Sequence, residues 1–250
     1  MKAEKGLAVQ SYCFRSIKDN AAVIDAVKAC GLKAVELCGV HVNFDDPASF
    51  QGIVDAYTKA GISIVSAGVN GIAGDEAAAD RRFQFVKMAG AKHMSVDFNL
   101  AAVPGAYRIA EKLAEKYDMR LGIHNHGGRH WLGSMAMIQK VLSETSERIG
   151  VCMDTAWALH SHEDPVQMAE KLGKRLFGLH LKDFTFDRSG KHTDVVVGTG
   201  NLDLSKLSGV LAKTGFSGCV VIEYEGDVNS PVPSVTECVK AVRAAVPELA

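Results

Sequence analysis

The sequence predicts an α/β fold, a single (β/α)₈ barrel that spans residues 1–250. Short β-rich segments alternate with helical patterns along the whole chain, and eight segments of each kind are recognised. A length of 250 residues is also typical of one such barrel. The sequence contains no evident linker, low-complexity tract or second domain. One domain with TIM-barrel architecture is therefore expected.

The elements follow one another in strict alternation. The predicted strands cover residues 6–14, 34–40, 63–69, 93–98, 120–126, 149–154, 176–183 and 219–225. The predicted helices cover residues 21–29, 48–60, 76–89, 105–116, 135–144, 166–172, 204–213 and 232–244.

Helical spacing and helix-ending glycines support these assignments. In the first helix, the apolar residues recur at the spacing of one helical face, at Val23, Ile24, Val27 and Cys30. A glycine follows several of the helices, where the chain must turn left-handed before the next strand. These glycines are Gly31, Gly61, Gly90 and Gly215.

An open, doubly wound sheet is the alternative fold. Such a sheet usually carries a glycine-rich turn after its first strand, but the corresponding segment SYCFRSIKDN contains no glycine. The segment 186–201 is long for a barrel loop and follows the seventh strand, on the rim where barrels bind ligands. We expect it to form a lid or a wall of the site.

Composition restricts the class of protein. A net charge of −1 with scattered basic residues argues against a nucleic-acid partner. The six cysteines form no CxxC pair and mostly lie in apolar runs, as buried thiols do in a reducing compartment. The first ten residues lack the apolar core of a secretory signal, and no apolar run reaches the length of about 18 residues that a membrane span needs. A cytoplasmic protein without membrane contact is expected.

Four consecutive predicted strands in the second half end on groups that bind divalent metals. The segments are RLGIHNH, IGVCMD, LFGLHLKD and CVVIEYE, and their candidate ligands are His124 or His126, Asp154, His180, and Glu223 or Glu225. These residues converge only if the strands lie parallel with their carboxyl ends on one rim. The metal hypothesis and the fold hypothesis are therefore linked.

Strand alternation determines which of these side chains share a face. His124 and His126 point to one side, with Asn125 opposite, and His180 shares its side with Lys182. Charged groups inside a barrel are costly unless they are paired or bound to metal. A mixed imidazole and carboxylate set suits one divalent ion, Mn²⁺, Co²⁺, Zn²⁺, Fe²⁺ or Mg²⁺. Such an ion polarises a carbonyl and assists proton removal from the neighbouring carbon.

The chain resembles the sugar phosphate isomerase/epimerase superfamily, the xylose isomerase-like TIM barrels. The resemblance covers nearly the whole chain and rests on VQSYCF, AVELCG, CMDT, GLHLKDF, VGTGNLD and VIEYEGD. It is specific for the superfamily and uninformative about the substrate. Relatives are often dimers or tetramers, so a homo-oligomer is compatible with it.

In the epimerase members, Glu, Asp, His and Glu from strands five to eight hold the metal. By resemblance, Asp154, His180 and Glu223 match the last three of these ligands. The fifth strand departs from the pattern, because IHNH places His124 where the epimerases have a glutamate, with His126 as an alternative ligand. The two glutamates are also the epimerase bases, so a two-base mechanism is in doubt. A histidine base fits enolisation by a single base, or β-elimination.

Further residues are candidates for contact with substrate. Lys182 is expected to bind a substrate oxygen or stabilise an enolate, unless it pairs with Asp183 on the rim. Glu36 on the second strand contacts either the substrate or a structural partner. Trp157 and Trp131 are candidate platforms for a sugar ring. The remaining candidates for substrate binding are His126, Arg129, His160 and Glu225.

The leading hypothesis is a metal-dependent isomerase or epimerase of a sugar or keto-sugar. The alternative is a lyase or dehydratase that acts on a 3-keto sugar, a keto-glycoside or an inosose-like substrate. An endonuclease IV-like DNA-repair enzyme would need more metal ligands and a basic groove. A sugar-binding barrel without catalysis would be expected to lack metal ligands.

Overall fold

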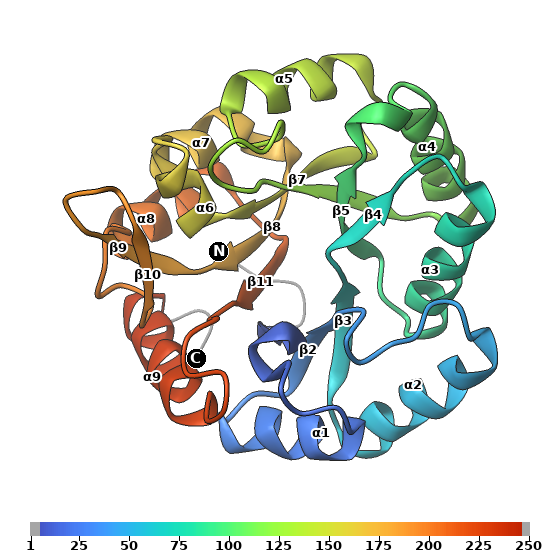
Figure 1. The fold of residues 1–250 in the computed structure, drawn as a ribbon, viewed down its shortest axis with the longest axis horizontal. Coiled ribbons are helices and arrows are strands. Elements are labelled where there is room, and N and C mark those ends of the chain that lie inside the picture. The colour runs from blue at the N-terminus through green and yellow to red at the C-terminus, as the bar shows by residue number, and fades with distance from the viewer. Residues whose placement is uncertain (1–5, 247–250) are drawn as a thin grey trace.

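The computed structural model describes residues 6–246 and confirms the predicted barrel, with helices around a cylinder of parallel strands (Figure 1). One sheet has the order β3-β2-β1-β11-β8-β7-β6-β5-β4, and all its pairs are parallel. Its strands are β1 (Leu7–Gln10), β2 (Ala34–Leu37), β3 (Ser63–Ala67), β4 (Asn70–Ile72), β5 (His93–Phe98), β6 (Arg120–His124), β7 (Ile149–Asp154), β8 (Leu176–Leu181) and β11 (Cys219–Ile222). The expectation about a signal sequence falls partly on residues 1–5, which lie outside the described residues.

The third barrel strand consists of two pieces. β3 pairs with β2, and β4 pairs with β5, so the two pieces together close the barrel. Gly68 lies at the break, where an added Cβ would be 1.7 Å from Ser95 Oγ. Only glycine allows this close approach, and the expected strand 63–69 is therefore interrupted at this point.

Helices connect the strands on the outside, where their apolar faces pack against the sheet. They are α1 (Asn20–Ala29), α2 (Phe50–Lys59), α3 (Glu76–Met88), α4 (Gly105–Tyr117), α5 (Met135–Glu144), α6 (Thr155–His160), α7 (Pro165–Leu172), α8 (Leu204–Thr214) and α9 (Val232–Ala245). Short 3₁₀ helices add η1 (Ser11–Phe14), η2 (Pro47–Ser49), η3 (Leu100–Ala102) and η4 (Gly173–Arg175). In the described part of the chain, no helix has both the length and the apolar character needed to cross a membrane.

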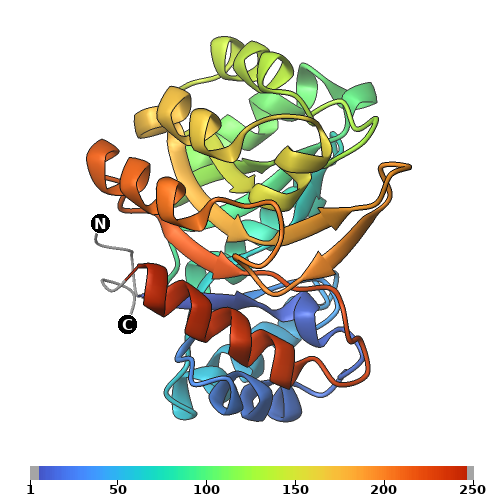
Figure 2. The ribbon, with the colours of Figure 1, turned by 90° about the vertical axis from the view of Figure 1, so that its left-hand side faces the viewer.

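Other parts of the sequence also differ from the prediction. Residues 11–14, expected to continue the first strand, form the 3₁₀ helix η1. The short helix α6 directly follows β7, in a segment expected to be a loop. The expected loop 186–201 contains the second strand of a hairpin, in which β9 (Asp183–Phe186) pairs with β10 (His192–Val195) in antiparallel fashion. Figure 2 shows this hairpin projecting from the barrel. The alternation of phenylalanine and polar residues in β9 is a strand pattern that the glycine content of the segment obscured.

Asp183 holds the connection after the hairpin. Its carboxylate accepts four backbone N–H bonds, from Gly198, Gly200, Asn201 and Leu202, at 2.9–3.0 Å. The pairing of Lys182 with Asp183 that the sequence allowed is therefore not formed, because Asp183 is committed to this loop. The GTGNL segment is a structural turn organised by a buried carboxylate.

The barrel interior changes in character from one end to the other. A small apolar cluster consists of Ala8, Ala34, Val65, Cys219 and Val221, at the first to third positions of their strands. Buried polar side chains occupy the third to fifth positions of their strands, and they include Gln10, Glu36, Ser95 and His180. All six cysteines are buried, and none forms a disulfide within the described residues. The polar end of the interior carries the candidate site.

Candidate metal centre

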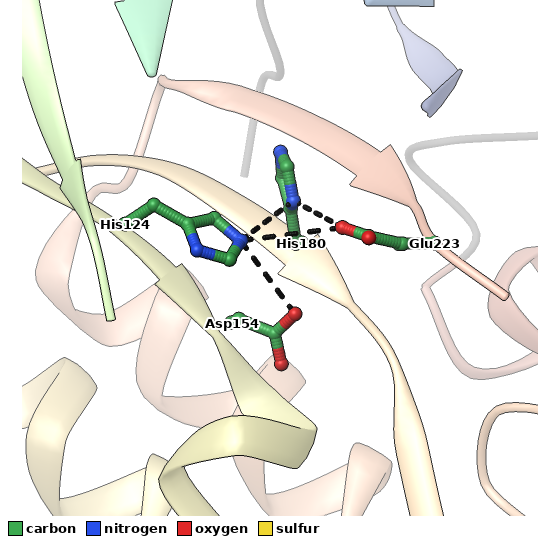
Figure 3. A group of neighbouring side chains, drawn as sticks. All are labelled: His124, Asp154, His180 and Glu223. Carbon is green, nitrogen blue, oxygen red and sulfur yellow. Dashed lines mark hydrogen bonds and ion pairs between the residues drawn. The ribbon is translucent and has the colours of Figure 1, made fainter. Parts of the chain in front are cut away.

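Four side chains from four neighbouring strands meet at the carboxyl end of the barrel (Figure 3). His124 ends β6, Asp154 ends β7, His180 lies in β8, and Glu223 directly follows β11. All four are buried, and one potential ligand atom from each lies within 4.8 Å of the others. The convergence expected from the four strand ends is therefore observed.

The imidazole of His124 faces the other three groups. Its Nε2 lies 3.1 Å from His180 Nδ1, 3.6 Å from Asp154 Oδ2 and 4.0 Å from Glu223 Oε2 (Figure 3). His180 Nδ1 is in turn 2.5 Å from Glu223 Oε2. Two imidazole nitrogens and two carboxylate oxygens are thus directed at one small volume.

The two carboxylate oxygens of Asp154 have different surroundings, one at the start of a helix and one in the cluster. Oδ1 accepts the Trp157 N–H at 2.8 Å and caps helix α6. Oδ2 is buried and has no hydrogen-bond partner among the described residues. Burial raises the pKa of this carboxyl to about 7. A buried carboxylate oxygen without a donor is costly, and a cation at this point would satisfy it.

The donor set fits a single divalent ion. Buried imidazole and carboxylate groups without a thiolate suit Zn²⁺, Fe²⁺, Co²⁺ or Mn²⁺, and Mg²⁺ less well because it prefers oxygen ligands. His124, Asp154, His180 and Glu223 are the residues that would hold the ion. Within the described residues, no other group of three or more such side chains comes as close together.

The three residues of the HNH segment lie in different surroundings. His124 enters the cluster, and the buried Asn125 bonds to the backbone of Asp154 on β7. His126 lies above His124, with the two ring centres 4.7 Å apart, and it lines the adjacent cavity. The structure thus places His124, rather than His126, among the potential metal ligands.

Lys182 is almost completely buried beside the cluster. Its Nζ pairs with the Glu225 carboxylate and lies 3.9 Å from Glu223 Oε1. It also lies 5.0 Å from the centre of the Trp157 ring and 5.4 Å from that of Phe184. Burial alone lowers the pKa of Lys182, but the surrounding carboxylates raise it above its ordinary value. Lys182 is therefore a fixed cation at the edge of the site.

A cavity of about 460 Å³ opens beside the four ligands. Its lining combines one wall from the first three barrel strands with residues of the cluster. The lining residues are Gln10, Tyr12, Cys38, Gly39, Val40, Gly68, Val69, His124, His126, Trp157, Glu223 and Glu225. No arginine or lysine is among them, so the cavity offers no unpaired cation to an anionic group.

The other residues expected to contact a substrate lie in different surroundings. His160 packs against Trp157 and His192 and does not line the cavity. Arg129 is exposed and also lies outside the lining. The indole of Trp131 donates to Phe98 O. Their roles in substrate binding remain predictions.

Glu36 lies beneath the cluster rather than in the cavity. It is fully buried, and Oε1 is 2.8 Å from His180 Nε2. Gln10 and Ser95 also donate to this oxygen. The sequence did not single out Gln10 or Ser95, although strand alternation places Gln10 on the inner face of the first strand.

Asp97 and His130, which the sequence pattern did not connect, also lie close together at the rim. Asp97 Oδ2 is 3.4 Å from His130 Nε2, and the His130 ring lies 4.9 Å from that of His126. Burial raises the pKa of Asp97, and its Oδ1 has no hydrogen-bond partner among the described residues. The inward position of Asp97 near the end of β5 was the available signal.

Comparison with known proteins gives relatives in both sequence and fold. A protein family described as "Xylose isomerase-like TIM barrel" matches residues 24–244. The rhizopine catabolism protein MocC of Rhizobium meliloti is 30% identical over 139 residues, which are 50% of this chain and 42% of that protein. An inosose dehydratase of Clostridium botulinum (strain Eklund 17B / Type B) is 28% identical over 154 residues, 55% of this chain and 50% of that one. The chain thus spans about half the length of these curated relatives.

Solved structures agree over a larger part of the chain. The structure of an L-ribulose 3-epimerase superposes with a TM-score of 0.77 at 13% identity, covering 98% of this chain and 96% of that chain. At this identity the likeness shows the fold alone.

Proposed function

The chain belongs to the family of xylose isomerase-like TIM barrels, and from that premise we propose that it is a divalent-metal-dependent isomerase or epimerase of a sugar or keto-sugar. The observation that carries the proposal is the convergence of His124, Asp154, His180 and Glu223 beside a cavity. Relatives of this chain include proteins named as enzymes of sugars and cyclitols.

The proposed reaction removes a proton from the carbon next to a substrate carbonyl. The ion held by the four residues would supply Lewis acidity that polarises this carbonyl. The protein must then provide a base, a cation for the developing negative charge, and a surface that orients the sugar.

Glu223 is the proposed base. It lines the cavity, and although burial raises its pKa, Lys182 and His180 hold that pKa well below its usual range. The carboxylate is therefore ionised, which is the form that a base must have. His124 is less suited to this role, because its Nε2 points into the cluster and its Nδ1 is buried without a hydrogen-bond partner among the described residues.

His126 is the proposed group that exchanges a proton at the neighbouring carbon or oxygen. It lines the cavity on the strand-five side, and burial together with His130 lowers its pKa to about 4. It is thus a neutral imidazole near pH 7. Lys182 supplies the fixed positive charge, and Glu225 holds the lysine in place.

The residues that line the cavity favour a neutral substrate. It contains no arginine or lysine, and the nearby charge of Lys182 is already balanced by Glu225 and Glu223. Trp157 offers an apolar ring face of the kind that packs against the C–H face of a sugar. A neutral keto-sugar or cyclic polyol ketone fits this lining better than a sugar phosphate does.

A dehydratase or lyase is the second candidate, and two observations favour it. The relatives named inosose dehydratase match about half of the chain, and, by the resemblance to the epimerases, His124 stands where a two-base epimerase has its strand-five glutamate. Elimination begins with the same proton removal by Glu223. It then expels the hydroxyl on the second carbon from the carbonyl as water, and the proton that Glu223 removed returns to the departing hydroxyl.

One experiment tests the shared step and separates the two fates. Metal-loaded protein is incubated in D₂O with neutral keto-sugars, inososes and 3-keto-glycosides, and the masses of the products are measured by mass spectrometry. Isomerisation with solvent exchange adds one mass unit for each exchanged proton, whereas dehydration removes a water. Wild-type protein is expected to label or dehydrate at least one substrate, and the Glu223→Gln variant is expected to do neither. Lack of both reactions across the panel would contradict the proposed function.

A further inference from the structure

His180 is held by carboxylates at both of its ring nitrogens. Nδ1 faces the cluster, 2.5 Å from Glu223 Oε2 and 3.1 Å from His124 Nε2. Nε2 faces away from it, 2.8 Å from Glu36 Oε1. An ionised carboxylate only accepts hydrogen bonds, so the contact with Glu36 requires a proton on Nε2. Glu223 makes the same demand on Nδ1, where a metal ion would take the place of a proton. With the ion bound, the ring is neutral and its Nδ1 lone pair faces the cluster.

Glu36 is itself fixed by side chains from two other strands. The amide of Gln10 on β1 donates to Glu36 Oε1 at 2.6 Å, and Ser95 Oγ on β5 donates at 3.1 Å. Gln10 is anchored in turn by Gly68 O, 3.1 Å from its Nε2. Because donors surround Oε1, this oxygen stays an acceptor, and its position relative to His180 is determined by the barrel strands.

Glu36 does not contact the cavity. Its exposed fraction is 0%, and it is not among the lining residues. At this position the Glu36 side chain has no surface on the cavity, so a contact of Glu36 with substrate stays a prediction without support from the lining. What remains is an action through the one potential metal ligand that it touches.

We propose that Glu36 is a positioning residue that holds the Nε2–H tautomer of His180 and so presents Nδ1 to the metal ion. Metal-binding histidines commonly donate their other N–H to a carboxylate, which fixes the ring and increases its basicity. Loss of such a partner typically lowers metal affinity by about 10–100-fold. The inference rests on the metal site of the proposed function and adds the residue that orients one of its ligands.

The test combines metal affinity with a direct view of the tautomer. Zn²⁺ affinity is measured by competition with a chromophoric chelator for wild type, Glu36→Gln, Glu36→Asp and Ser95→Ala. Long-range ¹H–¹⁵N spectra of the zinc-loaded proteins report which nitrogen of His180 carries the proton. We expect roughly 10–100-fold weaker binding for both Glu36 variants. Ser95→Ala should change affinity by less than about threefold, since the contact of Glu36 with His180 stays intact.

The aspartate variant separates positioning from simple charge. Asp keeps the negative charge but withdraws it by one methylene, so a positioning role predicts weaker binding and an altered His180 signal in both Glu36 variants. Wild-type affinity in Glu36→Asp, or unchanged affinity with only a lowered melting temperature in both variants, overturns the inference. If the variants do not fold, the wild-type spectrum decides, because a proton on Nδ1 of His180 also overturns it. Absence of metal binding by wild type would instead contradict the proposed function itself.

Discussion

Asn125 and Asp154 exchange two hydrogen bonds across the ends of β6 and β7. The Asn125 amide donates to Asp154 O at 3.0 Å, and Asp154 N donates to Asn125 Oδ1 at 2.9 Å. The side chain thus continues the pairing of two strands beyond the point where β6 ends. Asn125 directly follows one potential metal ligand, His124, and its side chain holds the backbone of another, Asp154.

Replacing Asn125 with aspartate should destabilise the protein. Aspartate cannot donate to Asp154 O and would place a charge at a fully buried position. We expect the free energy of unfolding to fall by at least about 2 kcal/mol, measured by urea denaturation. Asn99→Asp is the matched control, because exposed Asn99 only accepts, from Ala101 N at 2.9 Å, and aspartate does the same. Equal losses in the two variants would contradict this account.

Glu223 and Glu225 should differ sharply in their effect on metal binding. They are two residues apart, but only Glu223 belongs to the cluster, while Glu225 pairs with Lys182. We expect one divalent ion per chain in wild type and more than about 100-fold weaker affinity in Glu223→Gln, since even outer partners contribute about 10–100-fold. Glu225→Gln should stay within about threefold of wild type. Calorimetric titration of metal-free protein measures both, and a reversed order would refute the ligand set.

Lys182→Met should remove activity while the metal stays bound. Methionine fills a similar volume over Trp157 and Phe184 but leaves the carboxylates of Glu223 and Glu225 without their cation. We expect turnover to fall by about 100-fold or more and metal affinity to be retained or increased. The control is Lys206→Met, which removes only an exposed ion pair with Asp203. A fall in turnover matched by the control would argue against a role for the buried charge.

His93 should make the metal-free protein sensitive to acid. It is buried inside the barrel, neither ring nitrogen has a hydrogen-bond partner among the described residues, and burial lowers its pKa to about 4. The unfolded chain protonates its histidines near pH 6.5, so it binds a proton that the folded chain does not. The stabilisation is therefore complete above about pH 6.5 and is lost as the pH falls towards 4, by up to about 3 kcal/mol.

The contribution of His93 is isolated by comparison with His93→Gln. Urea denaturation at several pH values between 7.5 and 4.5 gives the pH slope of the unfolding free energy for each protein. Other buried histidines titrate in both proteins, so the difference between the slopes reports His93. The glutamine variant is expected to lose less stability in acid, and identical slopes would show that His93 is protonated in the folded state.

The strand pattern was sufficient to predict the barrel and the general position of the site. Alternation of β-rich and helical segments predicts eight parallel strands, and parallel strands bring their carboxyl ends to one rim. His124, Asp154, His180 and Glu223 therefore converge in the structure as the linear order implies. This convergence is a property of strand direction and of the two-residue period of side chains.

The contacts that distinguish one ligand from its neighbour depended on the tertiary structure. His180 and Glu36 are 144 positions apart in sequence, and only the closure of the barrel brings them within 2.8 Å. The choice of His124 over His126 likewise follows from where β6 ends, and that end is stabilised by Asn125. Neither contact can be predicted from residues that are close together in the sequence.

The chain by itself thus determined the fold, the rim and the chemical type of the site, because these follow from periodicity and strand direction. The tertiary structure decided that Lys182 pairs with Glu225 and that Asp183 holds a loop instead. It also decided that residues 183–195 form a projecting hairpin. These outcomes depend on which partners a buried charge or a strand edge finds among residues that are distant in sequence. Those residues become neighbours only when the strands assemble into the barrel.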